Sequence, residues 1–305
     1  MSDTAPRTGK IRMATLSEWV QGARPRTLPA AASPVAVGTG AAYALGRTTW
    51  GYAFLALVVA LCLQVGVNYA NDYSDGIRGT DEVRVGPVRL VGQRLAEPAD
   101  VRLAAMVSLF LAGLCGFAHV ALSQAWLMLP VGGLCILAAW YYTGGRNPYG
   151  YRGLGELFVF VFFGLVATLG TTYTQAGTLT WSGIAGAVGV GALATAILVA
   201  NNLRDIPTDS DHGKRTLAVR LGDAWTRRLY LGLVAVSVLA VAACATVSPT
   251  ALLALPAYLL VVPVVRTLRS GATEAALVPV LAGPGVFLLA WSLLLAVGIG
   301  VAALI

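Results

Sequence analysis

The chain has 305 residues and a formal net charge of +7, and 57% of its residues are hydrophobic whereas only 11% are charged. Soluble domains carry about 25% charged residues, so this composition excludes a soluble globular protein and also intrinsic disorder. The excess of Lys and Arg comes with no nucleic-acid-binding motif, and we expect it to serve membrane topology and contact with anionic lipid.

Six stretches of the chain contain no Asp, Glu, Lys or Arg, and each can hold one or two spanning helices of about 20 residues. They are residues 27–46, 48–71, 103–145, 157–203, 229–265 and 275–305. The third, fourth and fifth have turn-forming residues near their middles and predict two helices each. The sequence therefore predicts an all-α integral membrane protein with nine transmembrane helices in a bundle around a central cavity.

The charged residues predict the orientation of this bundle. All Lys and Arg residues except Arg47 fall before the first predicted helix or in the gaps that follow an even-numbered helix. Basic residues next to spans stay in the cytoplasm, which predicts a cytoplasmic N-terminus in an inner (plasma) membrane protein. Residues 1–26 would form a cytoplasmic segment with an interfacial helix near Trp19, and residues 27–305 the transmembrane domain.

All acidic residues also fall on the predicted cytoplasmic side, and two clusters stand out among them. The second predicted helix ends with Asn68, Asp72 and Asp75, which share one helical face because their spacing is i, i+4, i+7. The loop that follows continues to Asp81. A polar active site at the cytoplasmic face would explain this one-sided placement, since acidic residues contribute little to topology.

The sixth predicted helix ends with a similar cluster, in which Asn201, Asp205 and Asp209 are spaced by four residues. The two clusters resemble a parallel internal repeat, which would place both around one cavity. Carboxylate and amide oxygens suit Mg²⁺, which binds one or two carboxylates together with substrate phosphates. Ion pairs with the nearby arginines are the alternative interpretation, but the recurrence of the pattern favours a diphosphate held between metal ions.

The predicted gap between helices 4 and 5 contributes Tyr142 and Arg146, which are also spaced i, i+4. An arginine can bind two phosphate oxygens at once, and a tyrosine ring presents its π face to a cation. An aromatic belt with topology-determining arginines would give the same residue types.

These motifs resemble the signatures of the UbiA superfamily of intramembrane aromatic prenyltransferases, and the resemblance covers nearly the whole chain. Within the superfamily, the chain resembles the branch that acts on 1,4-dihydroxy-2-naphthoate in menaquinone biosynthesis. The residues that carry this resemblance lie in segments 23–28, 71–76, 84–89, 149–156, 202–206 and 214–220. Arg146 is a departure, because many members carry Lys there.

The resemblance implies Mg²⁺-dependent transfer of a polyprenyl group from polyprenyl diphosphate to 1,4-dihydroxy-2-naphthoate, with loss of CO₂. It implies one Mg²⁺ on Asp72 and Asp75 with Asn68, and another on Asp205 and Asp209 with Asn201. Arg146 and Lys214 would contact the phosphates, and Tyr142 would shield the allylic cation. Arg24 or Arg26 would bind the carboxylate of the acceptor, and Asp81 would assist a metal or act as a base.

Three other functions compete with this one. The acceptor could instead be 4-hydroxybenzoate, homogentisate or haem. A CDP-alcohol phosphatidyltransferase shares the Asp-x-x-Asp-Gly pattern of Asp72–Gly76, but its second acidic set should follow in the same loop. A secondary transporter shares the parallel repeat, but its polar residues should lie near the bilayer midplane, whereas these lie at one face.

Overall fold

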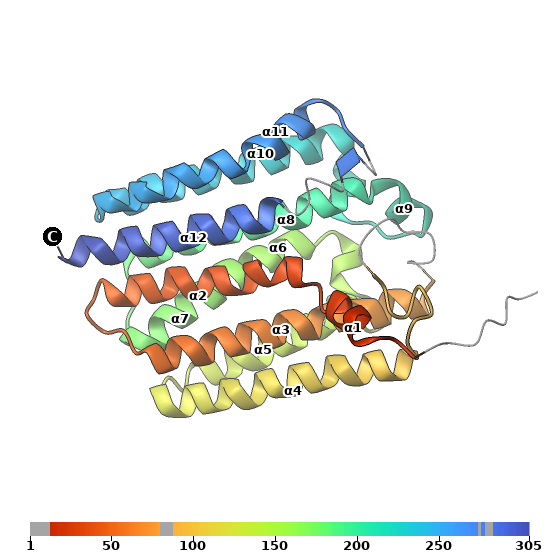
Figure 1. The fold of residues 1–305 in the computed structure, drawn as a ribbon, viewed down its shortest axis with the longest axis horizontal. Helices are drawn as coiled ribbons and strands as arrows, with labels where there is room; N and C mark the ends of the chain where they lie inside the picture. The colour runs from red at the N-terminus through yellow and green to blue at the C-terminus, as the bar shows by residue number, and fades with distance from the viewer. Residues whose placement is uncertain (1–12, 80–87, 274–275, 278–282, 305) are drawn as a thin grey trace, which may run out of the picture.

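The computed structural model describes residues 13–79, 88–273, 276–277 and 283–304, and these residues contain helices and no β-strand (Figure 1). The first half comprises α1 (Leu16–Gly22), η1 (Pro25–Thr27), α2 (Leu28–Tyr43), α3 (Trp50–Ile77), α4 (Pro98–Ser123), α5 (Met128–Tyr141), η2 (Tyr149–Arg152), α6 (Gly155–Val159), the π-helical η3 (Phe160–Val166) and α7 (Ala167–Ala176). The second half comprises α8 (Trp181–Arg204), α9 (Ile206–Asp211), α10 (Leu217–Ala245), η4 (Pro249–Leu260), α11 (Val262–Arg269), α12 (Gly283–Val301) and η6 (Ala302–Leu304).

Membrane-spanning character is clear in this set of helices. Within the described ranges, six helices are long and apolar enough to cross a membrane, and a seventh forms if η4 and α11, which meet at a 47° bend, make one span. Helices α2 and α5 are shorter, with 16 and 14 residues. The all-helical membrane fold is therefore confirmed, and each predicted span contains at least one helix, although only six or seven meet this length criterion.

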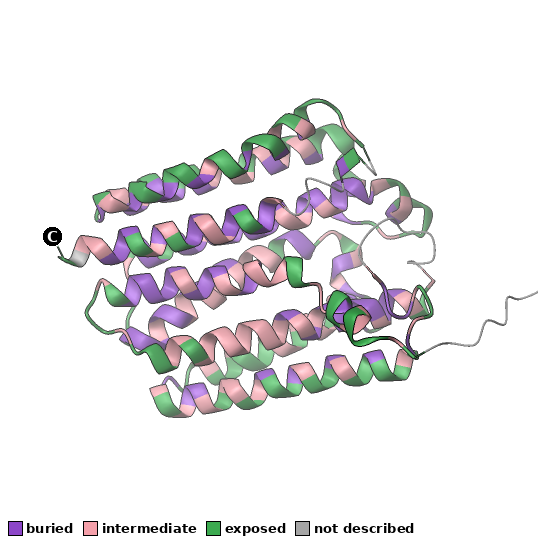
Figure 2. Cartoon of the chain, in the orientation of Figure 1, coloured by how far each residue is buried: buried purple, intermediate pink, exposed green. Residues whose placement is uncertain are grey.

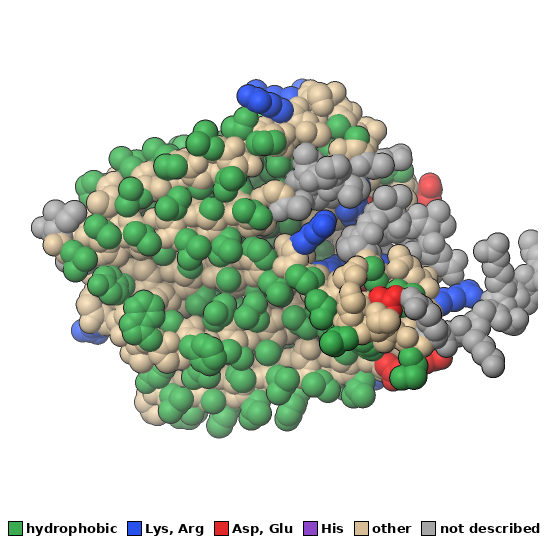
Figure 3. All heavy atoms as spheres, viewed as in Figure 1, with side chains coloured by type: hydrophobic (Ala, Val, Ile, Leu, Met, Phe, Trp, Pro, Cys, Tyr) green, Lys and Arg blue, Asp and Glu red, His purple; other side chains and the backbone are tan. Residues whose placement is uncertain are grey.

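The long helices lie side by side in one bundle, with α1 and α9 at one end and the C-terminal end of α12 at the other (Figure 1). Helix α8 is the most enclosed of the long helices, since 78% of an apolar 18-residue stretch of it is buried, whereas α4 lies mostly at the surface (Figure 2). Hydrophobic side chains cover most of the face seen in Figure 3, and acidic side chains gather at the end with α1 and α9. This distribution suits a bundle surrounded by lipid and polar at its ends.

Small residues let the helices of the bundle approach closely. A Cβ atom at Gly40 in α2 would lie 2.6 Å from the backbone oxygen of Ala296 in α12, so only glycine fits at this crossing. Around α8, the fully buried Trp291 and Leu295 of α12 pack in the larger hydrophobic core. Close packing of this kind holds membrane helices together, because lipid is as apolar as the side chains that would be buried.

Pro207 separates α8 from α9 at the acidic end of the bundle. Proline lacks the backbone N–H that would continue α8, and Asp205 caps α8 with φ −90° and ψ 3° before the six-residue α9 begins at Ile206. The break ends α8 at Arg204, and Asp209 in the following α9 is buried.

Candidate active site

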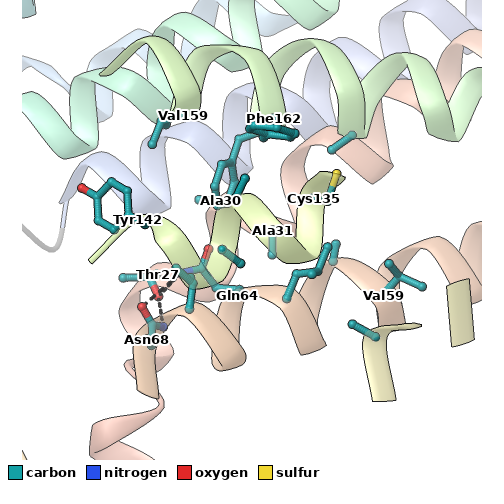
Figure 4. A pocket seen from close by; sticks show the side chains of 18 of the residues that line it. Thr27, Ala30, Ala31, Val59, Gln64, Asn68, Cys135, Tyr142, Val159 and Phe162 are labelled. Atoms are coloured by element: carbon teal, nitrogen blue, oxygen red, sulfur yellow. Dashed lines mark hydrogen bonds between the residues drawn. The ribbon is translucent and has the colours of Figure 1, made fainter. Parts of the chain in front are cut away.

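A cavity of about 1070 Å³ lies inside the bundle, between α2, α3, α4, α5, the α6–η3–α7 helix and α8 (Figure 4). Polar side chains line one end: Arg24, Arg26, Gln64, Asn68, Asn71, Asp75, Arg89, Asn201, Asn202, Arg204 and Lys214. Apolar side chains of α3, α5 and η3, including Val59, Ile136 and Phe162, line much of the rest, together with His119, Thr171 and Thr174. The cavity therefore offers a charged end and a long apolar body to the same ligand.

Asp75 lies in the last turn of α3 and lines the cavity directly, whereas the other described carboxylates of the predicted site, Asp72, Asp205 and Asp209, do not. The Tyr151 hydroxyl donates a hydrogen bond of 2.6 Å to its Oδ1 atom. Asn71 precedes Asp75 by one turn and also lines the cavity, and the Thr143 hydroxyl donates to its Oδ1 atom at 2.8 Å. Sequence reasoning did not select Asn71, although its i, i+4 spacing to Asp75 was a visible signal.

Asp72 has different contacts from those that the sequence predicts. It is fully buried and is not among the cavity-lining residues. Its Oδ2 atom accepts a hydrogen bond from the backbone N–H of Leu90 at 2.7 Å, and its Oδ1 atom accepts one from Val91 at 3.1 Å. Both carboxylate oxygens thus fasten the segment around residue 90 to α3.

Asn68, the third residue of this predicted cluster, lines the cavity, but its side-chain amide is hydrogen-bonded to residues that precede α2. Its side-chain amide donates to the carbonyl oxygen of Ala23 at 2.8 Å and to the Thr27 hydroxyl at 2.9 Å. It therefore ties α3 to the segment that leads into α2. The predicted residue Asp81 lies outside the described residues.

The second acidic cluster lies beside two cations that line the same cavity. Arg204 and Asp205 form a buried two-bond ion pair, with distances of 2.6 and 2.8 Å. Lys214 Nζ lies 3.5 Å from Asp209 Oδ1. Asn201 lines the cavity as predicted, and its amide donates to the carbonyl oxygen of Ile197 at 2.9 Å.

Tyr151 joins the two acidic clusters. Its hydroxyl binds Asp75, and Lys214 Nζ lies 5.1 Å from the centroid of its ring. Because Lys214 also pairs with Asp209, a continuous set of contacts runs from the end of α3 to α9. The structure thus brings Asp75 and Asp209 into one site, although they are far apart in the sequence. The role of Tyr151 was not visible from spacing alone.

The remaining predicted residues divide into two groups. Tyr142, Arg24 and Arg26 line the cavity, and the Tyr142 ring packs against Tyr149 at 5.4 Å between centroids. Desolvation raises the pKa of the Tyr142 phenol, and the Glu156 carboxylate raises it further. Arg146 is exposed and does not line the cavity.

The donor atoms at the polar end fit a hard cation. Within the part of the chain that the structure describes, no three His, Cys, Asp or Glu side chains gather as a metal site. Asn71 and Asp75 instead supply an amide and a carboxylate to the cavity from α3, and Asn201 supplies an amide from α8, while Asp209 lies buried beside Lys214 and does not itself line the cavity. Such a mixed oxygen set, completed by phosphate and water, is what Mg²⁺ prefers.

Comparison with known proteins adds three findings. The UbiA prenyltransferase family model matches residues 31–277. A 1,4-dihydroxy-2-naphthoate octaprenyltransferase from Mycobacterium tuberculosis is 56% identical over 93% of this chain and 97% of its own length, and one from Escherichia coli is 42% identical over 70% and 71%. The structure of a UbiA homolog from Archaeoglobus fulgidus bound to DMAPP and Mg²⁺ covers 93% of this chain and 99% of its own, with a TM-score of 0.64 at 16% identity.

Proposed function

The chain belongs to the UbiA prenyltransferase family, and from this we propose that it transfers a polyprenyl group from polyprenyl diphosphate to 1,4-dihydroxy-2-naphthoate in menaquinone biosynthesis. The cavity carries this proposal, because its charged end suits a diphosphate and its long apolar body suits an isoprenoid chain. The expected product is the hydroquinone form of demethylmenaquinone, formed with loss of CO₂ and release of diphosphate.

We further propose that all nine predicted segments cross the membrane, counting α2, α5 and the bent η4–α11 pair as spans. The distribution of Lys and Arg supports an N-terminus in the cytoplasm and an active site that faces it, in the inner (plasma) membrane. Residues 1–26 would then be a cytoplasmic segment in which α1 lies at the interface, and residues 27–305 would form the transmembrane domain.

For the metal ions, the contacts support Asp75 with Asn71 on one side, and Asp209 with Asn201 on the other, whereas both carboxylate oxygens of Asp205 pair with Arg204. Bound Mg²⁺ would neutralise the diphosphate as it leaves the allylic carbon. Asp72 is assigned to holding the segment around residue 90, since both of its oxygens are occupied by backbone N–H groups. Asp81 remains a candidate for a metal ligand or a base.

The chain's own cations and ring systems complete the site. Lys214 and Arg204 line the cavity beside the acidic clusters and would contact the phosphate oxygens. Arg146 is too exposed for that role. Arg24 or Arg26 would bind the carboxylate of the naphthoate, because both line the same end. The allylic C–O bond breaks with its electron pair on the diphosphate, and the electron-rich ring then attacks the allylic carbon.

Tyr142 is expected to act through its ring and not through its hydroxyl. Because its pKa is raised above the usual value near 10, the phenol stays neutral across the working range. Tyr142→Phe should therefore keep activity within about threefold and leave the pH–rate profile unchanged. Tyr142→Ala should lose about 30-fold in kcat, since a desolvated cation–π contact contributes about 2 kcal/mol. A large loss in Tyr142→Phe would contradict this role.

An acceptor assay tests the proposed function as a whole. Purified protein in lipid is given one polyprenyl diphosphate and Mg²⁺, with 1,4-dihydroxy-2-naphthoate, 4-hydroxybenzoate or homogentisate in parallel. We expect prenylated product and CO₂ with the naphthoate alone. Preference for another aromatic acid would reject the acceptor but keep the prenyltransferase chemistry, whereas no prenylated product with any acceptor would reject both.

A further inference from the structure

A small hydrogen-bond network lies in the cavity wall next to the segment that leads into α2 (Figure 4). The side-chain amide nitrogen of Gln64 donates to the Thr27 hydroxyl at 3.1 Å and to Asn68 Oδ1 at 3.3 Å. Asn68 donates to the same hydroxyl at 2.9 Å. All three side chains line the cavity, and Gln64 is only 6% exposed.

The direction of each hydrogen bond in this network is fixed by Thr27. Its hydroxyl donates its one hydrogen to the carbonyl oxygen of Arg24 at 2.9 Å, so it can only accept from the two amides. Gln64 must therefore turn its NH₂ group toward Thr27 and Asn68. Its carbonyl oxygen, Oε1, remains as an acceptor, and this buried atom has no hydrogen-bond partner among the described residues.

Leaving a buried acceptor without a partner is unfavourable, so a ligand that supplies a donor binds more tightly there. Polyprenyl diphosphate does not qualify, because its oxygens at neutral pH are acceptors and its chain is hydrocarbon. A phenolic hydroxyl does qualify, and the acceptor substrate of the proposed reaction carries two. Arg24 and Arg26, which line the same end of the cavity, offer charges for the carboxylate of that substrate.

We propose that Gln64 recognises a ring hydroxyl of the aromatic acceptor through its Oε1 atom, with Thr27 and Asn68 holding the amide in that orientation. This assignment rests on the proposed function. It makes Gln64 a binding residue that selects hydroxylated aromatic acids and contributes little to the diphosphate site. It also gives Asn68 a role in orienting Gln64, beside its contact with Ala23.

The test compares the binding of three naphthoates to the wild type and to Gln64→Leu. The ligands are 1,4-dihydroxy-2-naphthoate and the two analogues that lack one hydroxyl, 1-hydroxy-2-naphthoate and 4-hydroxy-2-naphthoate. The wild type should bind one analogue about tenfold more weakly than the dihydroxy compound, because one hydrogen bond is lost. Gln64→Leu should show no preference for that hydroxyl, while KM for polyprenyl diphosphate stays within about twofold.

Gln175→Leu is the matched control. Gln175 in α7 is also buried, donates to the Thr39 hydroxyl at 3.0 Å and has an Oε1 atom without a hydrogen-bond partner, but it lines a separate cavity of about 550 Å³. This control should keep the wild-type preference, and Gln64→Met provides a second test if the leucine variant does not fold.

Failure of the Gln64 assignment and failure of the proposed function give different results in this experiment. A folded Gln64 variant that retains the full preference for both hydroxyls overturns the assignment of Gln64. A wild-type protein that prenylates no naphthoate overturns the proposed function, and that failure is seen without any variant.

Discussion

Replacing Asp75 by asparagine is expected to lower kcat for prenyl transfer by at least about 1000-fold, because metal-borne stabilisation of developing charge contributes several kcal/mol. Asparagine keeps the size of the side chain and an oxygen that can accept from Tyr151, so the site should keep its shape. What is lost is the negative charge that faces the cavity at the end of α3. Turnover is measured with polyprenyl diphosphate and the naphthoate at saturating Mg²⁺.

Asp223→Asn is the control for this substitution. Asp223 is paired with Arg227 in α10, but it is 52% exposed and does not line the cavity. The same chemical change there should leave kcat within about twofold, since exposed ion pairs contribute little. If Asp75→Asn retained turnover near that of Asp223→Asn, Asp75 would have no part in holding the metal.

Replacing Asp72 by alanine is expected to destabilise the fold by about 2–6 kcal/mol. The substitution leaves the backbone N–H groups of Leu90 and Val91 without their acceptor, and each unpaired buried donor costs about 1–3 kcal/mol. Thermal unfolding in detergent should show a clear decrease in Tm for Asp72→Ala and almost none for Asp75→Asn.

Asp72→Asn distinguishes the structural role of Asp72 from a role as metal ligand. Asparagine keeps one acceptor oxygen, so this variant should lie between the wild type and alanine in Tm and should retain measurable turnover. Unchanged stability of Asp72→Ala together with complete loss of turnover would instead assign Asp72 to the metal, as the sequence spacing alone predicts.

The sequence was enough to predict the membrane class and the approximate positions of the helices. Both depend on where the charged residues fall and on the length of the stretches between them. The charge-free stretches overlap the long helices, although α3, α4 and α10 run beyond them, and the family motifs indicated the UbiA family, which the comparisons confirm. The same reasoning predicted that the ends of α3 and α8 contribute to one site. Tyr151 and Lys214 provide the contacts that join them.

The sequence could not show which of the neighbouring residues at the end of α3 face the cavity. The pairs Asn68–Asp72 and Asn71–Asp75 have identical spacing, so periodicity cannot decide which pair faces the cavity. The decision depends on the segment around residue 90, whose backbone N–H groups engage Asp72 and leave Asp75 at the cavity wall. Such a long-range backbone contact leaves no pattern in the sequence. The exposed position of Arg146 likewise depends on the loop conformation after α5.

If the two acidic helix ends hold a diphosphate through Mg²⁺, equilibrium binding of polyprenyl diphosphate should depend on both the metal and the carboxylates. The affinity of the wild type for polyprenyl diphosphate is measured once with Mg²⁺ and once with EDTA. The same two measurements are made on Asp75→Asn and Asp209→Asn. We expect Mg²⁺ to strengthen binding at least about tenfold in the wild type and to have little effect in either variant. Equal affinity of the wild type with and without Mg²⁺, or a full Mg²⁺ effect in both variants, would contradict the claim.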